Sequence, residues 1–126
     1  ADGTIDMVAT DHAPHTAEEK AREFAKAPSG ITGLETAFSV CNTYLVQPGK
    51  LTPMQLVDRM SKAPAEIYGL TDRAVQAGNF ARLVLLDWDT EKVYETYKSK
   101  GINTPCTGKK LTGSPKAIVT GTKVTE

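Results

Sequence analysis

A short apolar stretch followed at once by polar side chains constrains what this chain can fold into. Residues 4–10 (TIDMVAT) are rich in β-branched and apolar side chains, which is typical of a buried parallel strand. The next five residues, 11–15, read DHAPH, and Pro14 stops the strand and stiffens the turn. Because sites in parallel α/β proteins form where strands end, the sequence predicts a functional turn here.

The residues after this turn have the pattern of a helical region. Helices are predicted over residues 16–26, 34–46 and 52–60, with one further helical turn at 64–68. Leu34 stands on the predicted apolar face of the second of these helices. Two capping boxes, Thr16 with Glu19 and Thr52 with Gln55, indicate where helices begin.

The pattern changes after Gly69, which closes the helical region. A strand is predicted at 81–89, and a hairpin with strands at 117–119 and 123–125 flanks Gly121-Thr122. We therefore expect two units, residues 1–70 and 71–126. The chain opens at Ala1 rather than at a methionine, directly before the first predicted strand, so we expect a piece of a longer protein.

Composition argues against several kinds of surface. The 15 basic and 15 acidic residues give zero net charge, which argues against a nucleic-acid or membrane partner. No apolar run approaches the roughly 18 residues of a membrane span, and the first residues do not resemble a signal peptide. Cys41 and Cys106 lack CxxC spacing, so we expect two reduced thiols in a cytoplasmic protein rather than a disulfide.

Asp11, His12 and His15 are candidate site residues on chemical grounds. A carboxylate at a strand end can bind a metal and move protons, and a histidine can ligate, donate a hydrogen bond or hold an anion. A structural interpretation is equally open from the spacing alone. Aspartate after a strand often serves as a turn or cap residue, and a histidine beside it is often a satisfied structural group.

Four motifs, in order along the chain, resemble the class I bacterial dihydroorotases of the amidohydrolase superfamily. They are VATDHAPHTAEEK, APSGITGLETAF, KAPAEIYGL and NTP, the last at residues 103–105. KAPAEIYGL is shared more widely and supports the superfamily rather than the enzyme. The resemblance implies an α/β fold: the C-terminal portion of a (β/α)8 metal-dependent hydrolase barrel, with its last strand, substrate loop and helices in 1–70, followed by a small β-sandwich segment in 71–126.

The resemblance also implies a reaction and roles for particular residues. Dihydroorotases catalyse the zinc-dependent, reversible hydrolysis of the cyclic amide of dihydroorotate to N-carbamoyl-L-aspartate in pyrimidine synthesis. Asp11 matches the aspartate that is both a zinc ligand and the catalytic acid/base, and His15 matches the histidine that holds the substrate carboxylate. Ser29 and Gly30 match the loop pair that contacts the substrate, although family members often have a bulky apolar residue at Ser29. His12 matches no role at the metal or the substrate.

Most of such a site would lie outside these residues. A (β/α)8 barrel needs about 200 residues or more, and a catalytic zinc usually has about three protein ligands. His12 and His15 are the only histidines, so the family's His-x-His pair is absent. The resemblance thus implies that this chain alone holds no catalytic zinc and is inactive. Its partners would be the N-terminal part of the same enzyme, a small-molecule substrate, further copies of itself and, as in some family members, aspartate carbamoyltransferase.

Two alternatives stay open from the sequence. The first is another cyclic amidohydrolase, related to allantoinases or hydantoinases, since allantoinases share a DHAP-like turn. The second is a non-catalytic dihydroorotase-like subunit, against which the presence of Asp11 and His15 argues.

Overall fold

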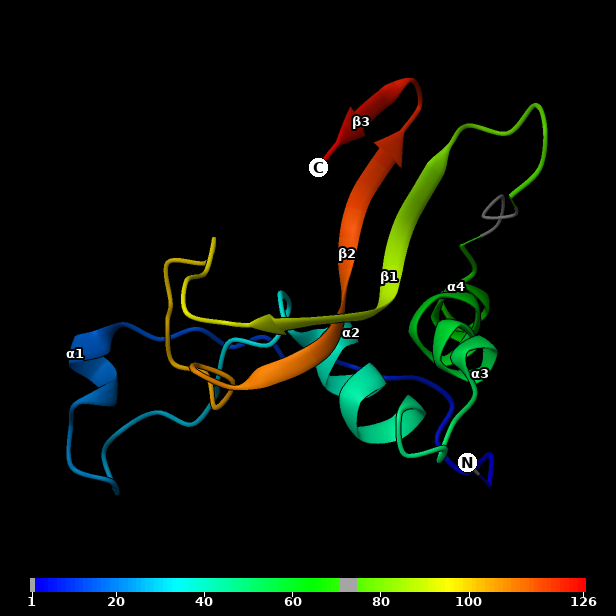
Figure 1. The fold of residues 1–126 in the computed structure, drawn as a ribbon. Coiled ribbons are helices and arrows are strands. Elements are labelled where there is room, and N and C mark those ends of the chain that lie inside the picture. Colours follow the sequence, from blue (N-terminus) through cyan, green and yellow to red (C-terminus); the bar gives the residue numbers. More distant parts are fainter. Residues whose placement is uncertain (1, 71–74) are drawn as a thin grey trace.

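The chain forms a helical part and a three-stranded antiparallel sheet that meet at helix α2 (Figure 1). The computed structural model describes residues 2–70 and 75–126. The helical elements are α1 (Ala17–Lys20), α2 (Ala37–Cys41), η1 (Asn42–Val46), α3 (Pro53–Val57), η2 (Asp58–Lys62) and α4 (Ala63–Ile67), and the strands are β1 (Arg82–Val93), β2 (Lys110–Thr120) and β3 (Lys123–Thr125). The two η segments are π-helical turns that continue the α-helices before them.

The predicted capping boxes both form. The Thr52 hydroxyl accepts a hydrogen bond from the Gln55 N–H, and the Gln55 side chain accepts one from the Thr52 N–H, at 3.2 and 2.8 Å. Thr16 and Glu19 make the same reciprocal pair. Helix α1 nevertheless ends at Lys20, well short of the predicted residue 26. It buries no side chain, and a short helix without a packed face gains too little to extend.

The predicted helix over 34–46 forms as α2 and η1, but it begins three residues later than expected. Leu34 lies in the turn before α2 and its side chain is 61% exposed, so the prediction that Leu34 faces the core is wrong. Phe38 and Ser39 supply the buried face instead. The predicted helix over 52–60 is confirmed and continues through η2 into α4, with Leu56 fully buried.

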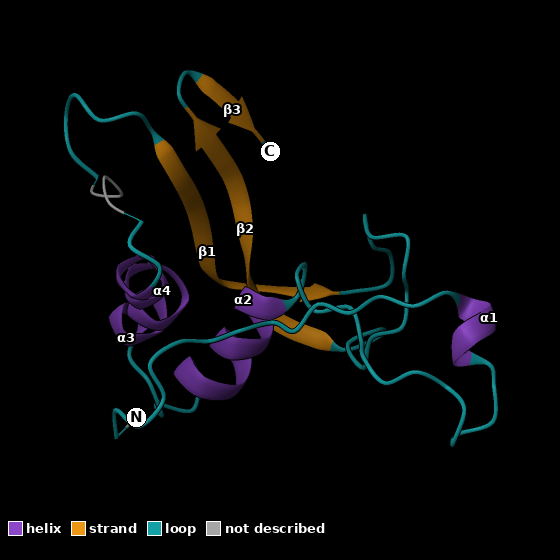
Figure 2. Cartoon of the chain, turned by 180° about the vertical axis from the view of Figure 1, so that it is seen from behind, coloured by secondary structure: helices purple, strands orange, loops and turns teal. Residues whose placement is uncertain are grey.

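Strands β1 and β2 form a long hairpin that bends sharply where it crosses α2 (Figure 2). Their register shifts between Leu85 and Leu86, and again between Asp87 and Glu91. Such bulges bend a strand pair and increase its twist. Opposite the second shift, Gly113 has φ +84, and a Cβ there would lie 2.6 Å from the Asn42 amide nitrogen, so only glycine lets the bend approach the helix.

Strands form at the predicted β-rich end: β1 and β2 are longer than expected, and β3 has the predicted bounds. The hairpin turn at Gly121-Thr122 joins β2 to β3 as predicted. The described residues contain one sheet, so a sandwich stays a prediction. Ala1 lies outside the described residues, and the predicted boundary between 70 and 71 adjoins residues 71–74, which also lie outside them.

The prediction of a strand at 4–10 is wrong for this structure. No strand ladder includes these residues, although the Val8 N–H donates to the Arg59 carbonyl at 3.0 Å. The physical reason is that a strand needs hydrogen-bonded neighbours, and none of the described residues pairs along this segment. Ile5, apolar and predicted to be buried, is 72% exposed.

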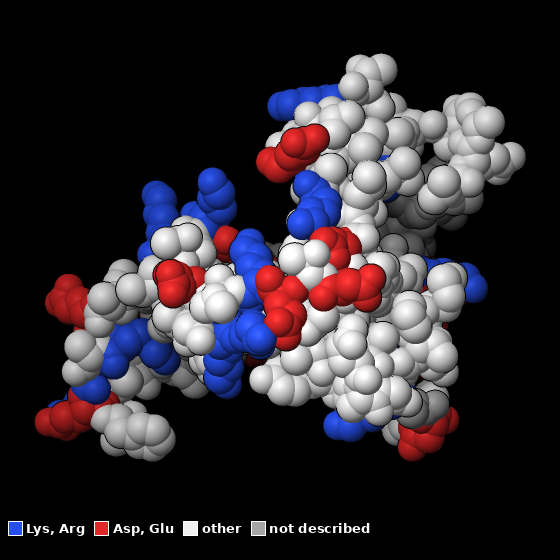
Figure 3. Space-filling model, in the orientation of Figure 1, with Lys and Arg blue, Asp and Glu red and all other residues white. Residues whose placement is uncertain are grey.

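Side chains of both charges are mixed on the face of the molecule that Figure 3 shows. In Figure 3, lysine and arginine side chains lie among aspartate and glutamate, with no broad field of one sign on the face shown. Within residues 2–70 and 75–126, no helix has the length and apolar character needed to cross a membrane.

The Asp87 carboxylate supports the bend of the hairpin and generates a prediction about acid stability. One of its oxygens accepts hydrogen bonds from the N–H groups of Thr90 and Asp89, both at 2.9 Å, and Lys116 lies 3.2 Å from the other oxygen. These hydrogen bonds, the Thr90 one foremost, hold the pKa of Asp87 well below its ordinary value of 3.8. A carboxyl group with a depressed folded-state pKa stabilises the fold above its unfolded pKa, and this stabilisation is lost as the pH falls through the folded value.

We expect Asp87→Asn to be less stable than the wild type at neutral pH. The amide oxygen can accept these bonds, but it lacks the negative charge that strengthens them and pairs with Lys116. The difference should narrow as the pH falls below the ordinary value of 3.8. Urea unfolding of both proteins across this range is the measurement. A stability difference that stays constant with pH would contradict the role given to the ionised carboxylate.

Candidate functional site

His12 joins the DHAPH turn to the glycine-rich loop that precedes α2. Its Nδ1 accepts hydrogen bonds from the N–H groups of Gly33 and Leu34, at 3.1 and 3.2 Å. Beside it, the Ala13 N–H donates to the Ile31 carbonyl at 2.9 Å, and His12 and Ile31 form an isolated parallel bridge. Because Nδ1 is occupied in this way, His12 serves to hold two segments together, which agrees with the absence of a family role for it.

Asp11 has a strained backbone. Its φ of +43 is the one positive value among non-glycine residues of the described chain. Aspartate tolerates the left-handed region better than most residues, yet such a conformation still costs about 1–3 kcal/mol. Strain of this kind persists where the surrounding structure imposes it and is a pointer to function. Asp11 is also exposed, so its carboxylate is accessible.

The structure brings His15 and Gly30, two of the predicted site residues, side by side. Gly30 has φ +113, and a Cβ there would lie 2.8 Å from Ala13 Cβ, 2.9 Å from Ala13 O and 3.4 Å from His15 Nε2. Only glycine permits both this backbone conformation and this approach. Ser29, the other predicted loop residue, precedes Gly30 and is exposed.

The imidazole of His15 lies between Gly30 and a carboxylate. Its Nδ1 lies 3.6 Å from Glu19 Oε2, while Nε2 is the ring nitrogen beside Gly30. Hydrogen bonds from the Thr16 N–H and hydroxyl lower the pKa of Glu19, and the charge of His15 lowers it further. Glu19 is therefore ionised at neutral pH, and its carboxylate faces the Nδ1 side of the His15 imidazole. A cleft of about 330 Å³ opens here, lined by Pro14, His15, Thr16, Glu19, Ser99, Lys100 and Gly101.

Two side chains that the sequence analysis did not single out hold the Gly30 loop. Lys20 Nζ donates to the carbonyls of Pro28 and Gly30, at 2.9 and 3.2 Å. Asn103 Nδ2 donates to the same Gly30 carbonyl at 2.9 Å. Both residues lie within the motifs that resemble the family, and this was the one feature of the sequence that could have pointed to them. Their partners lie too far away in sequence for spacing to identify them.

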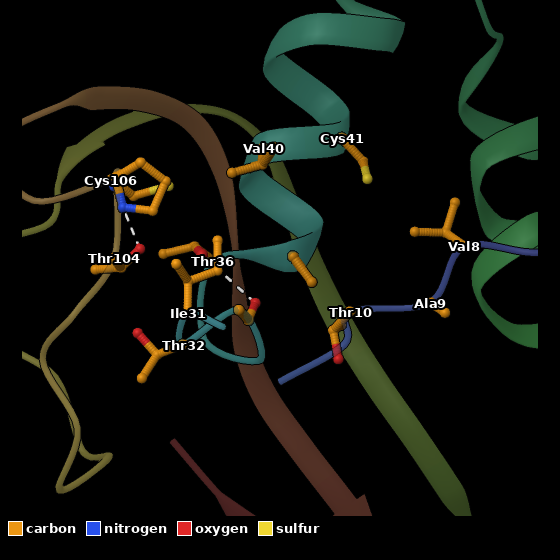
Figure 4. Close-up of a pocket in the computed structure, with 13 residues that line it drawn as sticks. Val8, Ala9, Thr10, Ile31, Thr32, Thr36, Val40, Cys41, Thr104 and Cys106 are labelled. Carbon is orange, nitrogen blue, oxygen red and sulfur yellow. Dashed lines mark hydrogen bonds between the residues drawn. The ribbon is translucent and has the colours of Figure 1, made fainter. Parts of the chain in front are cut away.

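A second cavity, of about 220 Å³, is apolar and is a poor candidate for a polar substrate (Figure 4). It lies between residues 8–10, the 31–33 loop, α2 and residues 104–106. The Thr104 hydroxyl accepts a bond from the Cys106 N–H rather than facing a ligand. Cys41 and Cys106 are unpaired thiols. Burial raises the pKa of Cys41, which suits a packing residue and not a nucleophile.

The described residues do not by themselves fit a catalytic zinc. Within residues 2–70 and 75–126, no three His, Cys, Asp or Glu side chains gather in a group that could hold a metal ion. Asp11 offers a carboxylate, whereas Nδ1 of His12 is already hydrogen bonded to backbone. About three protein ligands are usual for such a metal, so further ligands would have to come from elsewhere in a longer protein.

Gly30 generates a prediction with a matched control. Gly30→Ala adds both an unfavourable φ and a steric clash, whereas Gly49→Ala, at φ +74 with nothing within 4 Å of its Cβ, adds the backbone strain alone. We expect both variants to lose stability, Gly49→Ala by about 1 kcal/mol and Gly30→Ala by clearly more. Parallel urea unfolding measures this. Equal losses in the two variants would show that the loop moves freely away from Ala13.

The comparisons with known proteins find similar sequences and structures over almost the whole chain. No family model matches the chain. Dihydroorotases from Bacillus cereus (strain B4264) and Bacillus thuringiensis (strain Al Hakam) are each 46% identical to it over 125 residues, which are 98% of this chain and 29% of theirs. Among solved structures, an L-hydantoinase (dihydropyrimidinase) from Arthrobacter aurescens has a TM-score of 0.88 and 30% identity, and a D-hydantoinase (dihydropyrimidinase) from Thermus sp. a TM-score of 0.85 and 29% identity.

The solved structures show the same partial coverage as the sequences. The chain is covered over 98% and 97% of its length, against 29% and 28% of the two hydantoinases. It therefore spans less than a third of the relatives that it matches, which is consistent with a C-terminal part of an amidohydrolase. Since these relatives are dihydroorotases and hydantoinases, the comparisons support the cyclic amidohydrolase family for this chain.

Proposed function

We propose that this sequence is the C-terminal part of a zinc-dependent dihydroorotase, which opens the cyclic amide of dihydroorotate to N-carbamoyl-L-aspartate. The observation that carries the proposal is the position of His15 Nε2 beside the Gly30 loop, directly after the strained Asp11. The similarity to dihydroorotases over 98% of the chain supports it.

The proposed substrate is an anion, and the position of His15 suits the binding of an anionic group. Glu19 faces Nδ1 of His15, so the opposite nitrogen, Nε2, is free to point toward a ligand at the Gly30 loop. A histidine ring nitrogen can donate a hydrogen bond to a carboxylate, so Nε2 suits the anionic group of the substrate. The small Ser29 and Gly30 leave the backbone of this loop open to close contact.

Asp11 is the group that moves a proton in this proposal. Its exposed carboxylate would be the zinc ligand that this chain contributes, with the remaining ligands supplied by the rest of a longer enzyme. When bound, zinc supplies a hydroxide at neutral pH by lowering the pKa of water to about 7. As that hydroxide adds to the amide carbonyl, Asp11 would take its remaining proton, and it would pass this proton to the ring nitrogen as the C–N bond breaks.

The proposal also accounts for the segment at 4–10 that lacks strand partners. In a complete (β/α)8 barrel it would be the last strand, between the first and the seventh, and its unpaired backbone groups would be satisfied there. The helices that follow would cover the barrel wall. This chain alone would then be inactive.

The function is tested on the full-length protein with a panel of substrates. Ring opening of dihydroorotate should be faster than that of allantoin or a 5-substituted hydantoin, and removal of metal by a chelator should abolish it. Preference for a hydantoin or for allantoin would replace the proposed substrate while keeping the reaction class. Full activity after metal removal would contradict zinc dependence.

Substitutions of the two site residues should change different kinetic parameters. Asp11→Asn removes the proton-transfer group, so we expect kcat to fall by roughly 100-fold or more. His15→Ala removes binding to the substrate carboxylate in both the ground state and the transition state, so it should chiefly raise KM. Steady-state kinetics of the full-length variants separate these effects. A near-normal kcat in Asp11→Asn would show that the family role does not transfer to this residue.

The isolated 126-residue chain should not remain a monomer. Several large apolar side chains are exposed, among them Ile5, Leu34, Met54 and Ile67. Unpaired backbone and contiguous apolar surface favour association. Light scattering measures the mass, and hydrogen exchange measures protection at residues 5–9. A monodisperse monomer with strong protection along that segment would mean that the chain closes its own core, and the barrel proposal would fail.

A further inference from the structure

One side chain of the loop between β1 and β2 makes hydrogen bonds to both segments that form the proposed site. The amide group of Asn103 bridges two site residues, because Nδ2 donates to the Gly30 carbonyl at 2.9 Å and Oδ1 accepts from the His15 N–H at 3.4 Å. Its backbone carbonyl accepts a third bond, from the Thr32 N–H at 3.0 Å. Asn103 is thus hydrogen bonded to both segments that form the site.

Only a primary amide of this length meets both demands at once. A carbonyl oxygen requires a donor and an N–H requires an acceptor, so the partners of Asn103 also fix which way its amide group points. Aspartate would offer an acceptor alone, and an apolar residue would offer neither. The chemistry of the contact therefore selects asparagine rather than a generic polar residue.

The loop that carries Asn103 is itself held in place by independent contacts. The Glu35 carboxylate accepts hydrogen bonds from the N–H groups of Lys98 and Ser99, both at 2.8 Å. Gly101 packs so tightly that a Cβ there would lie 2.7 Å from Pro14 Cβ. The loop is therefore a fixed support for Asn103 and not a free surface segment.

We infer that Asn103 is a positioning residue for substrate binding, one that sets the relation between His15 and the Gly30 loop without touching the substrate. This inference rests on the proposed function. Lys20 also bonds to the Gly30 carbonyl, but it makes no bond to the DHAPH turn. His12 belongs to the DHAPH turn itself and bonds to Gly33 and Leu34, beyond Gly30. Asn103 differs from both, because it lies outside the two segments and its side chain bonds to His15 and to Gly30.

The test is Asn103→Ala in the full-length protein, with Asp87→Ala as the matched control. Each change removes two hydrogen bonds between a side chain and the backbone in the same β-hairpin region. Asp87→Ala also removes the ion pair with Lys116, so it is the more disruptive change locally, but Asp87 makes no bond to the site. Without the bridge, His15 and the Gly30 loop are no longer held in one relative position, so their contacts with the substrate should weaken. We expect Asn103→Ala to raise KM for dihydroorotate about tenfold, with a much smaller change in kcat. Asp87→Ala should leave KM unchanged.

Amide hydrogen exchange gives a readout that does not depend on activity. Asn103→Ala should speed exchange at Ala13 and Thr32, whose N–H groups donate across the site, whereas Asp87→Ala should not. Faster exchange together with the rise in KM supports the inference. Faster exchange with an unchanged KM overturns it, because the bridge would then be structural only, and so does the absence of both effects.

Failure of the inference can be told from failure of the proposed function. A wild-type protein that does not open dihydroorotate overturns the proposed function, and KM is then measured with the cyclic amide that it does open. Should Asn103→Ala not fold, Asn103→Ser replaces the donor and acceptor by one hydroxyl and carries the same test.

Discussion

The contact between helix α2–η1 and the bend of the β-hairpin is the interaction on which the rest of the structure depends. The Asn42 amide, fully buried, donates to the carbonyls of Trp88 and Thr112 at 2.9 Å each, and the Ser39 hydroxyl donates to Gly113 O. These carbonyls lie at or beside the second register shift, between Asp87 and Glu91, and polar side chains of the helix bond to them. A buried carbonyl without a partner costs about 1–3 kcal/mol, so this contact fixes where the hairpin lies.

From this contact the hairpin extends in two directions. One end continues to β3, away from the candidate site, and the other leads into the 94–109 loop (Figure 1). That loop meets the turn at His15 and the loop at Gly30. The proposed substrate-binding region is therefore formed by segments from the first and the last parts of the chain, and the helical part fixes their relative position.

Local features of the structure could be predicted from sequence, and contacts distant in sequence could not. The capping box at Thr52 depends on two residues that are three positions apart, so it can be recognised from the sequence. The segment at 4–10 has the composition of a strand, but pairing needs partners that composition cannot supply. The spacing of apolar residues predicts Leu34 on a helix. Instead, the side chain of His12, 22 residues earlier, accepts a hydrogen bond from the Leu34 N–H and holds Leu34 in the turn before α2. Asn103 lies 73 residues from Gly30, and no periodicity connects them.

The glycine at position 101 has a consequence for how this protein can change in evolution. Surface loops usually accept insertions and deletions, because their backbones lie against solvent. Here the backbone of Gly101 lies directly against Pro14, with no side chain between them to absorb a shift. An insertion or deletion near Gly101 would therefore displace the DHAPH turn by nearly the same distance as the loop. Insertions and deletions should therefore occur before residue 98 or after residue 103. The segment between them should keep its length even where its sequence differs.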